Sequence, residues 1–550
     1  MDVELEANHI ALLQHRAKNS GNAVLFKLPI LRGSGPPQEW NDVTVAEFAA
    51  EVDKVASFVM TELKARGIPP RSVVSVLYSG SRHQDLIYTI ALARASYIPQ
   101  MCIDDLTHPG IIFALMEKAG SRMILYDPSL EHVMVNCPFP KLALNPIETI
   151  ESCSTVSSDS VLPTIEDLSS GLDVCFIYLT SGSTSGSPKI VPLTQKFVSI
   201  YYKTQFGIWL DGRCFDTQNG FLSRGSICAV ASMIQYLGCL YTGSCIVRPS
   251  KMRFSTEELL NMVNVCGLNH MTTYGTWLAP HIQAAKKDPV ALKLLQEMRT
   301  VSYGGVPISI ADDDWCFQND IPLMDMYATT ECGTLMVSVP GKPARFMHPV
   351  SGISYRFDPL TDTTTEVDNP ASTQLLKFIL LADSPQIPQP HLLSTDGNFH
   401  TGDLFEKQLD GSYLFRGRAD DWIKSEDASL IDTKAIEEKI YDVCSDLVKK
   451  CIVVGHLRPS PALFIEVHHD DLSVISEDSL KVLVLQRLED FNARQYTHER
   501  ITDKRLIFIV DEGVLPRTRK GNFRRRAIEQ KYQKELDAVY MSLYGLSLST

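Results

Sequence analysis

The sequence predicts an α/β protein with a large N-terminal domain, residues 1–419, and a small C-terminal α+β domain, residues 420–550. A chain of 550 residues exceeds what one hydrophobic core usually organises, so two or more domains are expected. In the N-terminal part, segments with helical periodicity alternate with short apolar runs, which is typical of α/β layering. After Asp420 a shorter pattern begins, with a helix, strands and a basic C-terminal helix.

The first alternation begins near residue 44. Thr44 and Glu47 have the spacing of a capping box, and apolar residues follow at helical spacing until a Gly/Pro stop near residue 67. The elements expected next are a strand at Val73–Leu77, a helix at Asp85–Ser96 and a strand at Tyr97–Ile103. Further on, a Ser/Thr-rich loop is expected at 151–170 and an exposed Pro-rich connection at Ser384–Pro390.

The segment between Tyr178 and Lys189 carries the most specific chemical pattern. It follows an apolar run, Val174–Leu179, and precedes a second one, Ile190–Leu193. Its glycines let the backbone approach a ligand, its hydroxyls can hydrogen-bond, and its lysine adds a positive charge, which suits a polyphosphate. A flexible Ser/Gly linker is the alternative, but linkers rarely lie between two such runs.

This segment is not the phosphate loop of nucleoside triphosphatases. That loop places lysine directly after its last glycine and a hydroxyl residue after the lysine. Here two residues separate Gly186 from Lys189, and Ile190 follows. The segment instead resembles the Thr-Ser-Gly-Ser-Thr-Gly-x-Pro-Lys signature of the adenylate-forming superfamily, with Ser185 as an additional residue. This superfamily includes acyl-CoA synthetases, luciferases and the adenylation domains of nonribosomal peptide synthetases.

Further segments resemble motifs of the same family in the expected order. They are Tyr303–Pro307, Met326–Cys332, His400–Asp403, Phe415–Lys424 and Leu515–Gly521. The sequence of these segments is most similar to fungal synthetase-like proteins and adenylate-forming reductases. The resemblance implies layered sheets and helices in the large domain and a small domain that rotates about a hinge at Asp420.

The resemblance also implies the nucleotide-binding residues. The β- and γ-phosphates of ATP would lie against Thr180, Ser181, Gly182, Ser183, Thr184 and Gly186, with the charge of Lys189 close by. The adenine would lie beside Gly304 and Gly305, between Tyr327 and Phe415, and the ribose hydroxyls would bind Asp403, with Arg418 nearby. Thr330 would hydrogen-bond the α-phosphate, and Glu331 would hold Mg²⁺, which prefers carboxylate and phosphate oxygens.

Taken alone, Glu331 would more often be a solvated surface acid and Asp403 a turn residue. The ordered set of motifs favours the functional interpretation of both. Lys520 is the predicted catalytic lysine, although the usual family pattern has lysine after the glycine, where this chain has Asn522. A basic helix start or a docking surface for an acidic partner is the alternative. Lys424, beyond the hinge, is predicted to act mainly in acyl transfer.

The substrate pocket is expected to be apolar. Amino-acid-activating relatives place an aspartate some twelve residues before a Thr-Gly turn, and the same count from Thr242 reaches Val230. The predicted lining is Val230, Ile234, Tyr274 and Met326. Such a pocket offers no partner for a buried ammonium group, so an apolar or aromatic carboxylic acid without an α-amino group is expected.

The predicted reaction is ATP-dependent formation of an acyl-adenylate, followed by acyl transfer to a thiol or an amine. The thiol would belong to CoA or to the phosphopantetheine of a carrier protein. A carrier would act in trans or as a missing downstream domain, since only thirty residues follow Lys520. The alternative is a binding protein that holds ATP or an adenylate without turnover.

Composition excludes several other classes of protein. A net charge of −13 argues against nucleic-acid binding as the main task, and no apolar stretch is long enough for a membrane span. The N-terminus lacks the pattern of a secretory signal. Thirteen scattered cysteines without a C-x-x-C pair indicate reduced thiols in a cytoplasmic protein.

Overall fold

The computed structural model describes residues 8–33, 35–103, 108–152, 162–164, 173–180, 189–210, 217–305, 307–360, 375–419, 422–425, 430–467, 476–495, 497–517 and 523–544. The fold is α/β, as predicted, with a large N-terminal part of sheets and helices and a small C-terminal part. The loop predicted at 151–170 falls mostly outside the described residues.

A six-stranded sheet forms one layer of the N-terminal part. Its strands are β3 (Val73–Tyr78), β4 (Ile98–Ile103), β5 (Ser121–Tyr126), β6 (Lys141–Ala143), β7 (Val174–Thr180) and β8 (Lys189–Thr194). They run in the order β6-β5-β3-β4-β7-β8, and all neighbours are parallel except the antiparallel pair β7–β8. Both apolar runs around the Ser/Gly segment are therefore strands, and Thr180 lies opposite Lys189.

A thirteen-stranded sheet runs through the rest of the large part. Its strands are β1 (Val24–Pro29), β2 (Trp40–Thr44), β9 (Gly220–Leu222), β10 (Cys245–Val247), β11 (Leu268–Tyr274), β12 (Thr300–Gly304), β13 (Leu323–Thr329), β14 (Gly333–Ser338), β15 (Met347–Pro349), β16 (Tyr355–Pro359), β17 (Leu375–Leu380), β18 (Phe399–Lys407) and β19 (Tyr413–Arg418). Their order is β16-β17-β18-β19-β15-β14-β13-β12-β11-β9-β10-β1-β2. The stretch from β13 to β1 is parallel, so the carboxyl ends of these strands meet at one edge.

Helices cover these sheets. They are α1 (His9–Ser20), α2 (Val45–Ala65), α3 (His83–Arg94), α4 (Pro109–Ala119), α5 (Gln195–Leu210), α6 (Val230–Thr242), α7 (Thr256–Cys266), α8 (Gly275–Ala285), α9 (Pro289–Gln296) and α10 (Ile310–Gln318). The capping box that starts α2 is present, with Thr44 N–H donating to Glu47 over 2.8 Å. Helix α3 begins two residues before the predicted Asp85, because the Asp85 carboxylate accepts the Arg82 N–H and so caps the helix earlier.

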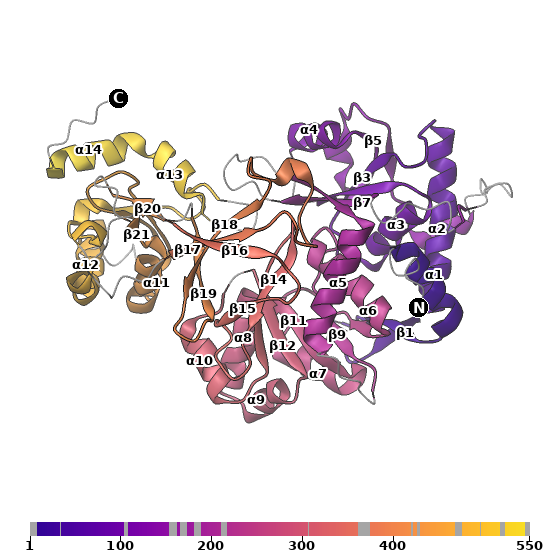
Figure 1. Cartoon of the computed structure of the whole chain (residues 1–550), viewed down its shortest axis with the longest axis horizontal. Helices are drawn as coiled ribbons and strands as arrows, with labels where there is room; N and C mark the ends of the chain where they lie inside the picture. The colour runs from indigo at the N-terminus through magenta and orange to yellow at the C-terminus, as the bar shows by residue number, and fades with distance from the viewer. Residues whose placement is uncertain are drawn as a thin grey trace.

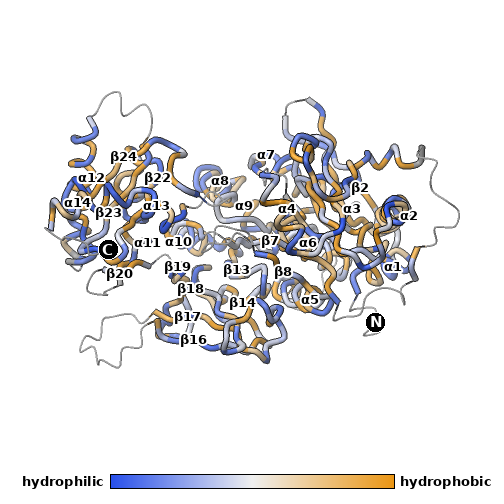
Figure 2. Tube along the Cα trace, turned by 90° about the horizontal axis from the view of Figure 1, so that it is seen from above, coloured by the Kyte–Doolittle hydropathy of each residue, from blue (hydrophilic) through white to orange (hydrophobic). Residues whose placement is uncertain are grey.

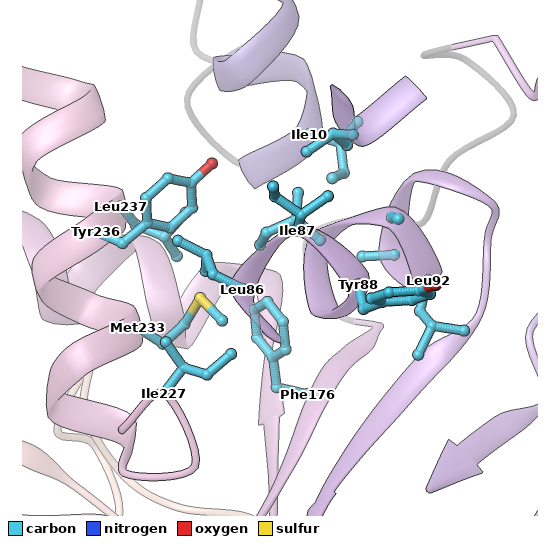
Figure 3. Close-up of a cluster of buried hydrophobic side chains, with 14 of the residues drawn as sticks. Ile10, Leu86, Ile87, Tyr88, Leu92, Phe176, Ile227, Met233, Tyr236 and Leu237 are labelled. Carbon is cyan, nitrogen blue, oxygen red and sulfur yellow. The ribbon is translucent and has the colours of Figure 1, made fainter. Parts of the chain in front are cut away.

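The main core lies where α3 and α6 pack against the six-stranded sheet. Figure 3 shows Leu86 of α3 beside Met233 of α6, with Phe176 of β7 below them. All three side chains are buried. Ile227, in the loop before α6, joins the same cluster, so the core fixes the position of the chain that leads into this helix.

The C-terminal part has its own core. Its elements are β20 (Ile423–Lys424), β21 (Leu430–Ile431), α11 (Thr433–Cys444), β22 (Val448–Val454), β23 (Ala462–Val467), α12 (Glu477–Arg494), β24 (Ile507–Val510), α13 (Arg525–Lys531) and α14 (Gln533–Tyr544). They gather at one end of the molecule (Figure 1), and apolar stretches of β22 and β23 lie inside that end (Figure 2). The predicted boundary at Asp420 stays a prediction, since residues 420 and 421 lie outside the described ranges.

The structure also bears on the thiols and on membrane insertion. Every described cysteine is a free thiol, and most are buried. Among the helices that the structure describes, none is both long and apolar enough to cross a membrane.

Candidate active site

Three of the predicted site residues are side by side at the carboxyl edge of the thirteen-stranded sheet. Tyr274 pairs with Gly304, and Gly304 pairs with Met326, across parallel strands. A Cβ atom at Gly304 would lie 2.7 Å from the Met326 carbonyl oxygen, so a larger residue does not fit. Gly305 follows with a φ of +82°. The two glycines leave bare backbone at this edge, as a flat ligand such as an adenine requires.

Tyr327, Asp403 and Arg418 form a connected polar group beside these glycines. Tyr327 Oη donates to Asp403 Oδ2 over 2.5 Å, and Arg418 Nη1 lies 3.4 Å from Asp403 Oδ1. Asp403 and Arg418 are cross-strand partners on β18 and β19, which explains their proximity. The Asp403 side chain is almost fully buried, so a ligand hydroxyl that reaches it would meet an acceptor shielded from water.

The aromatic part of the site is built around Tyr327. Its ring centroid lies 6.0 Å from that of Phe415, at an interplanar angle of 31°. Burial, and then the negative charge of Asp403, raise the pKa of Tyr327 well above its usual value, so its hydroxyl stays a donor at neutral pH. Lys434, on α11 of the C-terminal part, lies over Phe415 with its Nζ 5.5 Å from the ring centroid.

The turn that carries Thr330 and Glu331 is held from several directions. Thr329 Oγ1 accepts the Cys332 N–H over 3.0 Å. Tyr201 of α5 packs against the same turn, because a Cβ at Gly333 would lie only 2.9 Å from its ring. These contacts fix the backbone, and both Thr330 and Glu331 remain partly exposed.

Gln386 supports this turn from the Pro-rich segment. With its amide nitrogen facing the turn, it donates to Thr334 O over 3.1 Å and to Cys332 O over 3.2 Å. The prediction that Ser384–Pro390 is an exposed connection is therefore wrong for three of its seven residues. Ser384, Gln386 and Pro388 are buried, while the residues between them face outward or lie near the surface. The segment is irregular, as expected, but alternate residues are buried, and one of them, Gln386, bonds to the start of β14.

Glu331 lies on the wall of a cavity of about 400 Å³. Thr194 and Lys196 line it from one side, and Ser384 and Gln389 from the other. The part of the chain that the structure describes contains no cluster of three metal-binding side chains. A single carboxylate fits Mg²⁺, which keeps several waters and usually binds one or two carboxylates together with substrate phosphates. Glu331 is thus a suitable magnesium ligand in the presence of a polyphosphate.

Several predicted residues lie outside the described ranges. They are Ser181, Gly182, Ser183, Thr184 and Gly186 of the phosphate segment, Asp420 of the hinge and the catalytic candidate Lys520. The flanking Thr180 and Lys189 are described, at the facing ends of β7 and β8. Lys424 pairs through its backbone with Leu430 in the two-stranded sheet β20–β21.

The predicted substrate-pocket residues differ in their surroundings. Val230 and Ile234 of α6 are packed into the main core, with Ile234 fully buried. Met326 is buried as well, and the indole nitrogen of Trp209 lies 3.1 Å from its sulfur. Tyr274 is partly exposed at the sheet edge and makes an edge-on contact with Trp277. The apolar character expected for this region is present, mostly as packed core.

Asp325 is a titratable group that the sequence analysis did not single out. Burial, reinforced by the charge of Asp313, raises the pKa of Asp325 to about 7, although the hydroxyl of Tyr303 donates to it. The charge of Lys434 acts in the opposite direction.

Gln386, Arg224 and Lys434 are further residues that sequence reasoning missed. Only their neighbours in space, and no local pattern, reveal them.

Comparisons with known proteins agree with this arrangement. The family model of the AMP-binding enzyme matches residues 13–364, and that of the AMP-binding enzyme C-terminal domain matches residues 420–543. The chain is 86% identical over 519 residues to the AMP-binding domain-containing enzyme iboA of Amanita muscaria (strain Koide BX008), covering 94% of this chain and 100% of the relative.

More distant relatives share parts of the chain or its fold. The adenylate-forming reductase Nps10 of Heterobasidion annosum is 22% identical over 270 residues, which span 48% of this chain but only 24% of the reductase. The o-succinylbenzoate CoA synthetase of Bacillus subtilis, solved with an acyl-adenylate, matches with a TM-score of 0.72 at 16% identity, covering 94% of this chain and 97% of the synthetase. The latter likeness concerns the fold alone.

Proposed function

Because the chain belongs to the AMP-binding enzyme family, as an adenylate-forming enzyme, we propose that it activates a carboxylic acid with ATP and passes the acyl group on. The first step forms an acyl-adenylate and releases pyrophosphate. The second transfers the acyl group to the thiol of CoA or of a carrier-protein phosphopantetheine, or to an amine. The observation that carries the proposal is the grouping of Tyr327, Asp403 and Arg418 beside the bare backbone of Gly304 and Gly305.

The nucleotide would bind along the carboxyl edge of the large sheet. The adenine would lie on the backbone of Gly304 and Gly305, beside the rings of Tyr327 and Phe415, and the ribose hydroxyls would donate to Asp403. Thr330 and Glu331 follow Tyr327 within one short turn, which brings them toward the phosphates. The strand pair β7–β8 would present the phosphate segment, whose first and last residues, Thr180 and Lys189, are paired.

Negative charge develops on the α-phosphate while the carboxylate oxygen attacks it. Groups placed in advance around those oxygens lower the barrier more than groups that must first reorient. Thr330 would donate a hydrogen bond to the α-phosphate, and Glu331 would hold Mg²⁺, which supplies positive charge to the phosphate oxygens when bound. Lys520 would reach the same oxygens from the C-terminal part.

The acid is proposed to have an apolar or aromatic body and no α-amino group. Val230, at the position where amino-acid-activating relatives carry an aspartate, cannot pair with an ammonium group. Val230 and Met326 are buried apolar residues that would contact the body of the acid. Reduced cysteines and the absence of a membrane-spanning helix among the described residues support a cytoplasmic enzyme.

Acid-dependent exchange of pyrophosphate into ATP tests the proposal. We expect Mg²⁺-dependent exchange with at least one acid from a panel of aliphatic, aromatic and amino acids. Glu331→Gln should suppress it, and Glu489→Gln, an exposed substitution on α12, should not. ATP binding without exchange on any acid would overturn the enzymatic proposal and leave a nucleotide-binding protein.

A further inference from the structure

Arg224 lies at the sheet edge next to the proposed nucleotide site. It follows β9, two residues after Leu222, and β9 is the parallel neighbour of β11. The order of strand ends along this edge is β13, β12, β11 and β9. They carry Met326, Gly304, Tyr274 and Arg224 in the same order. If the adenine lies on Gly304, Arg224 is two strands away, on the side of Tyr274, one of the predicted substrate-pocket residues.

The backbone at Arg224 is held by a buried glutamine. Gln235 of α6 is 1% exposed, and its Oε1 accepts the Arg224 N–H over 3.0 Å. Its amide nitrogen donates to Leu222 O over 2.8 Å and to Thr272 Oγ1 over 2.9 Å. All the hydrogen-bonding groups of this amide except one lone pair are thus used to fix the end of β9, so the starting point of the arginine side chain is well defined.

Among the residues that the structure describes, none supplies the guanidinium of Arg224 with the anion that half-buried arginines usually have. Its Nε is buried without a hydrogen-bond partner, and none of the described carboxylates forms an ion pair with it. Two other arginines that are partly or fully buried contrast with it, since Arg345 lies 2.8 Å from Asp313 and Arg525 lies 2.8 Å from Glu437. A cation removed from water without a counter-charge is costly, and a ligand that supplies the charge recovers this cost.

One described neighbour of Arg224 is a neutral aromatic side chain. Tyr201 of α5 lies within electrostatic reach of both Arg224 and Tyr274, and burial raises the pKa of Tyr201 to about 12, so it is uncharged at neutral pH. The ring of Tyr201 also packs against the turn at Gly333. Tyr201 therefore connects Arg224 with Tyr274 of the proposed acid pocket and with the turn of Thr330 and Glu331, and no described carboxylate forms an ion pair with the guanidinium.

We propose that Arg224 binds a second carboxylate of the substrate, and that the enzyme prefers a dicarboxylic acid, one end of which is adenylated while the other pairs with the guanidinium. Arginine and carboxylate groups match in a bidentate geometry that a neutral chain end cannot offer. The inference rests on the proposed adenylating activity. It assigns a charged end to an acid whose body still contacts Met326 and Tyr274. The phosphate chain of ATP is another source of negative charge that Arg224 could bind, and the KM for ATP distinguishes it from a substrate carboxylate.

Pyrophosphate exchange with matched acids tests this role. Suitable sets are pentanoic acid, pentanedioic acid and its monomethyl ester, and benzoic acid with benzene-1,3-dicarboxylic acid and its monomethyl ester. We expect kcat/KM to be about 10- to 100-fold higher for the better of the two diacids than for its monoacid and its ester, the range given by one charge-assisted hydrogen-bonded pair. Arg224→Met should abolish this preference, and Arg224→Lys should retain part of it. Arg253→Met, at an exposed site, is the matched control.

Two further measurements, the melting temperature and the KM for ATP, complete the test of Arg224. Arg224→Met should leave the melting temperature unchanged or higher, because it removes an unpaired, half-buried charge. A clear loss of stability would assign Arg224 a structural role instead. An equal rise in the KM for ATP with every acid would assign the guanidinium to the phosphates. Equal exchange with matched mono- and diacids would overturn only the role of Arg224, whereas no exchange by the wild type with any acid would overturn the adenylating activity as well.

Discussion

The hydroxyl of Tyr327 and the carboxylate of Asp403 are joined by a 2.5 Å hydrogen bond, although they are 76 residues apart in the chain. The bond connects the strand that leads into Thr330 and Glu331 with the strand that carries the proposed ribose-binding acid. It therefore orients Asp403 from the side opposite to Arg418. A ligand that binds Asp403 has to share this carboxylate with the tyrosine.

Tyr327→Phe is expected to weaken ATP binding while leaving the ring in place. A hydrogen bond to a charged group contributes about 1.5–3 kcal/mol, so the KM for ATP in pyrophosphate exchange should rise about tenfold or more. Tyr413→Phe on β19 is the matched control, since the Tyr413 ring stacks on Phe357 of β16 with a centroid distance of 4.1 Å. Equal KM values for both variants would show that the Tyr327 hydroxyl does not orient the Asp403 carboxylate for nucleotide binding.

Lys520→Ala should abolish most adenylation, and Asn522→Ala should do little. The lysine would stabilise the charge that builds up between the carboxylate and the α-phosphate, and removal of such a group typically costs on the order of 10²–10³ in rate. Initial rates of acid-dependent exchange measure the effect. Equal, mild effects of the two substitutions would mean that another group does this work.

Asp420→Pro should spare adenylate formation and suppress acyl transfer. A hinge residue must reach two backbone conformations, and proline holds φ near about −65°, which traps one of them. Asp420→Ala removes the carboxylate but leaves φ free, so it should permit both half-reactions. Lys424→Ala should lower transfer more than adenylation. Exchange and acyl-transfer assays on each variant decide between gating and misfolding, because misfolding would remove both activities together.

Asp325→Asn should change how stability depends on pH. The pKa of Asp325 is raised from its usual value of 3.8 to about 7, so the folded protein holds a proton that the unfolded chain releases. The contribution of this group to stability is therefore lost as pH rises from about 4 to about 7. Relative to the asparagine variant, the melting temperature of the wild type should fall across this pH window. Above the window, the melting temperatures of the two proteins should change with pH in the same way. Asp490→Asn, on the exposed face of α12, should leave the pH dependence of the melting temperature as it is in the wild type.

Local features of the fold could be predicted from the sequence because their determinants are close together in the chain. The helix that starts after Thr44 depends on a hydrogen-bonding partner three residues away, and the strands around the Ser/Gly segment depend on two apolar runs. The pairing of β1 with β10 depends on contacts more than two hundred residues apart. No local pattern specifies such neighbours.

The candidate site shows the same division. Tyr327, Asp403 and the nearby Arg418 could be named because they belong to ordered motifs, but the hydrogen bond between Tyr327 and Asp403 became visible only in the structure. Gln386 was missed because a Pro-rich segment suggests exposure, while its amide in fact satisfies two carbonyl groups of the turn near Glu331. Arg224 was missed because an arginine after an apolar strand carries no signal of its own.

The main hydrophobic core of the large part and the hydrophobic core of the C-terminal part share no residue among those the structure describes. All residues of the main core come before the predicted hinge, and those of the C-terminal core run from Ile423 to Tyr540. Cooperative melting requires a common core, so heating should dissolve the two parts in separate transitions, visible as two peaks in calorimetry. Between these transitions the large part would keep its nucleotide-binding strands while overall turnover is already lost. Thermal inactivation would then report the weaker core and not the stability of the ATP site.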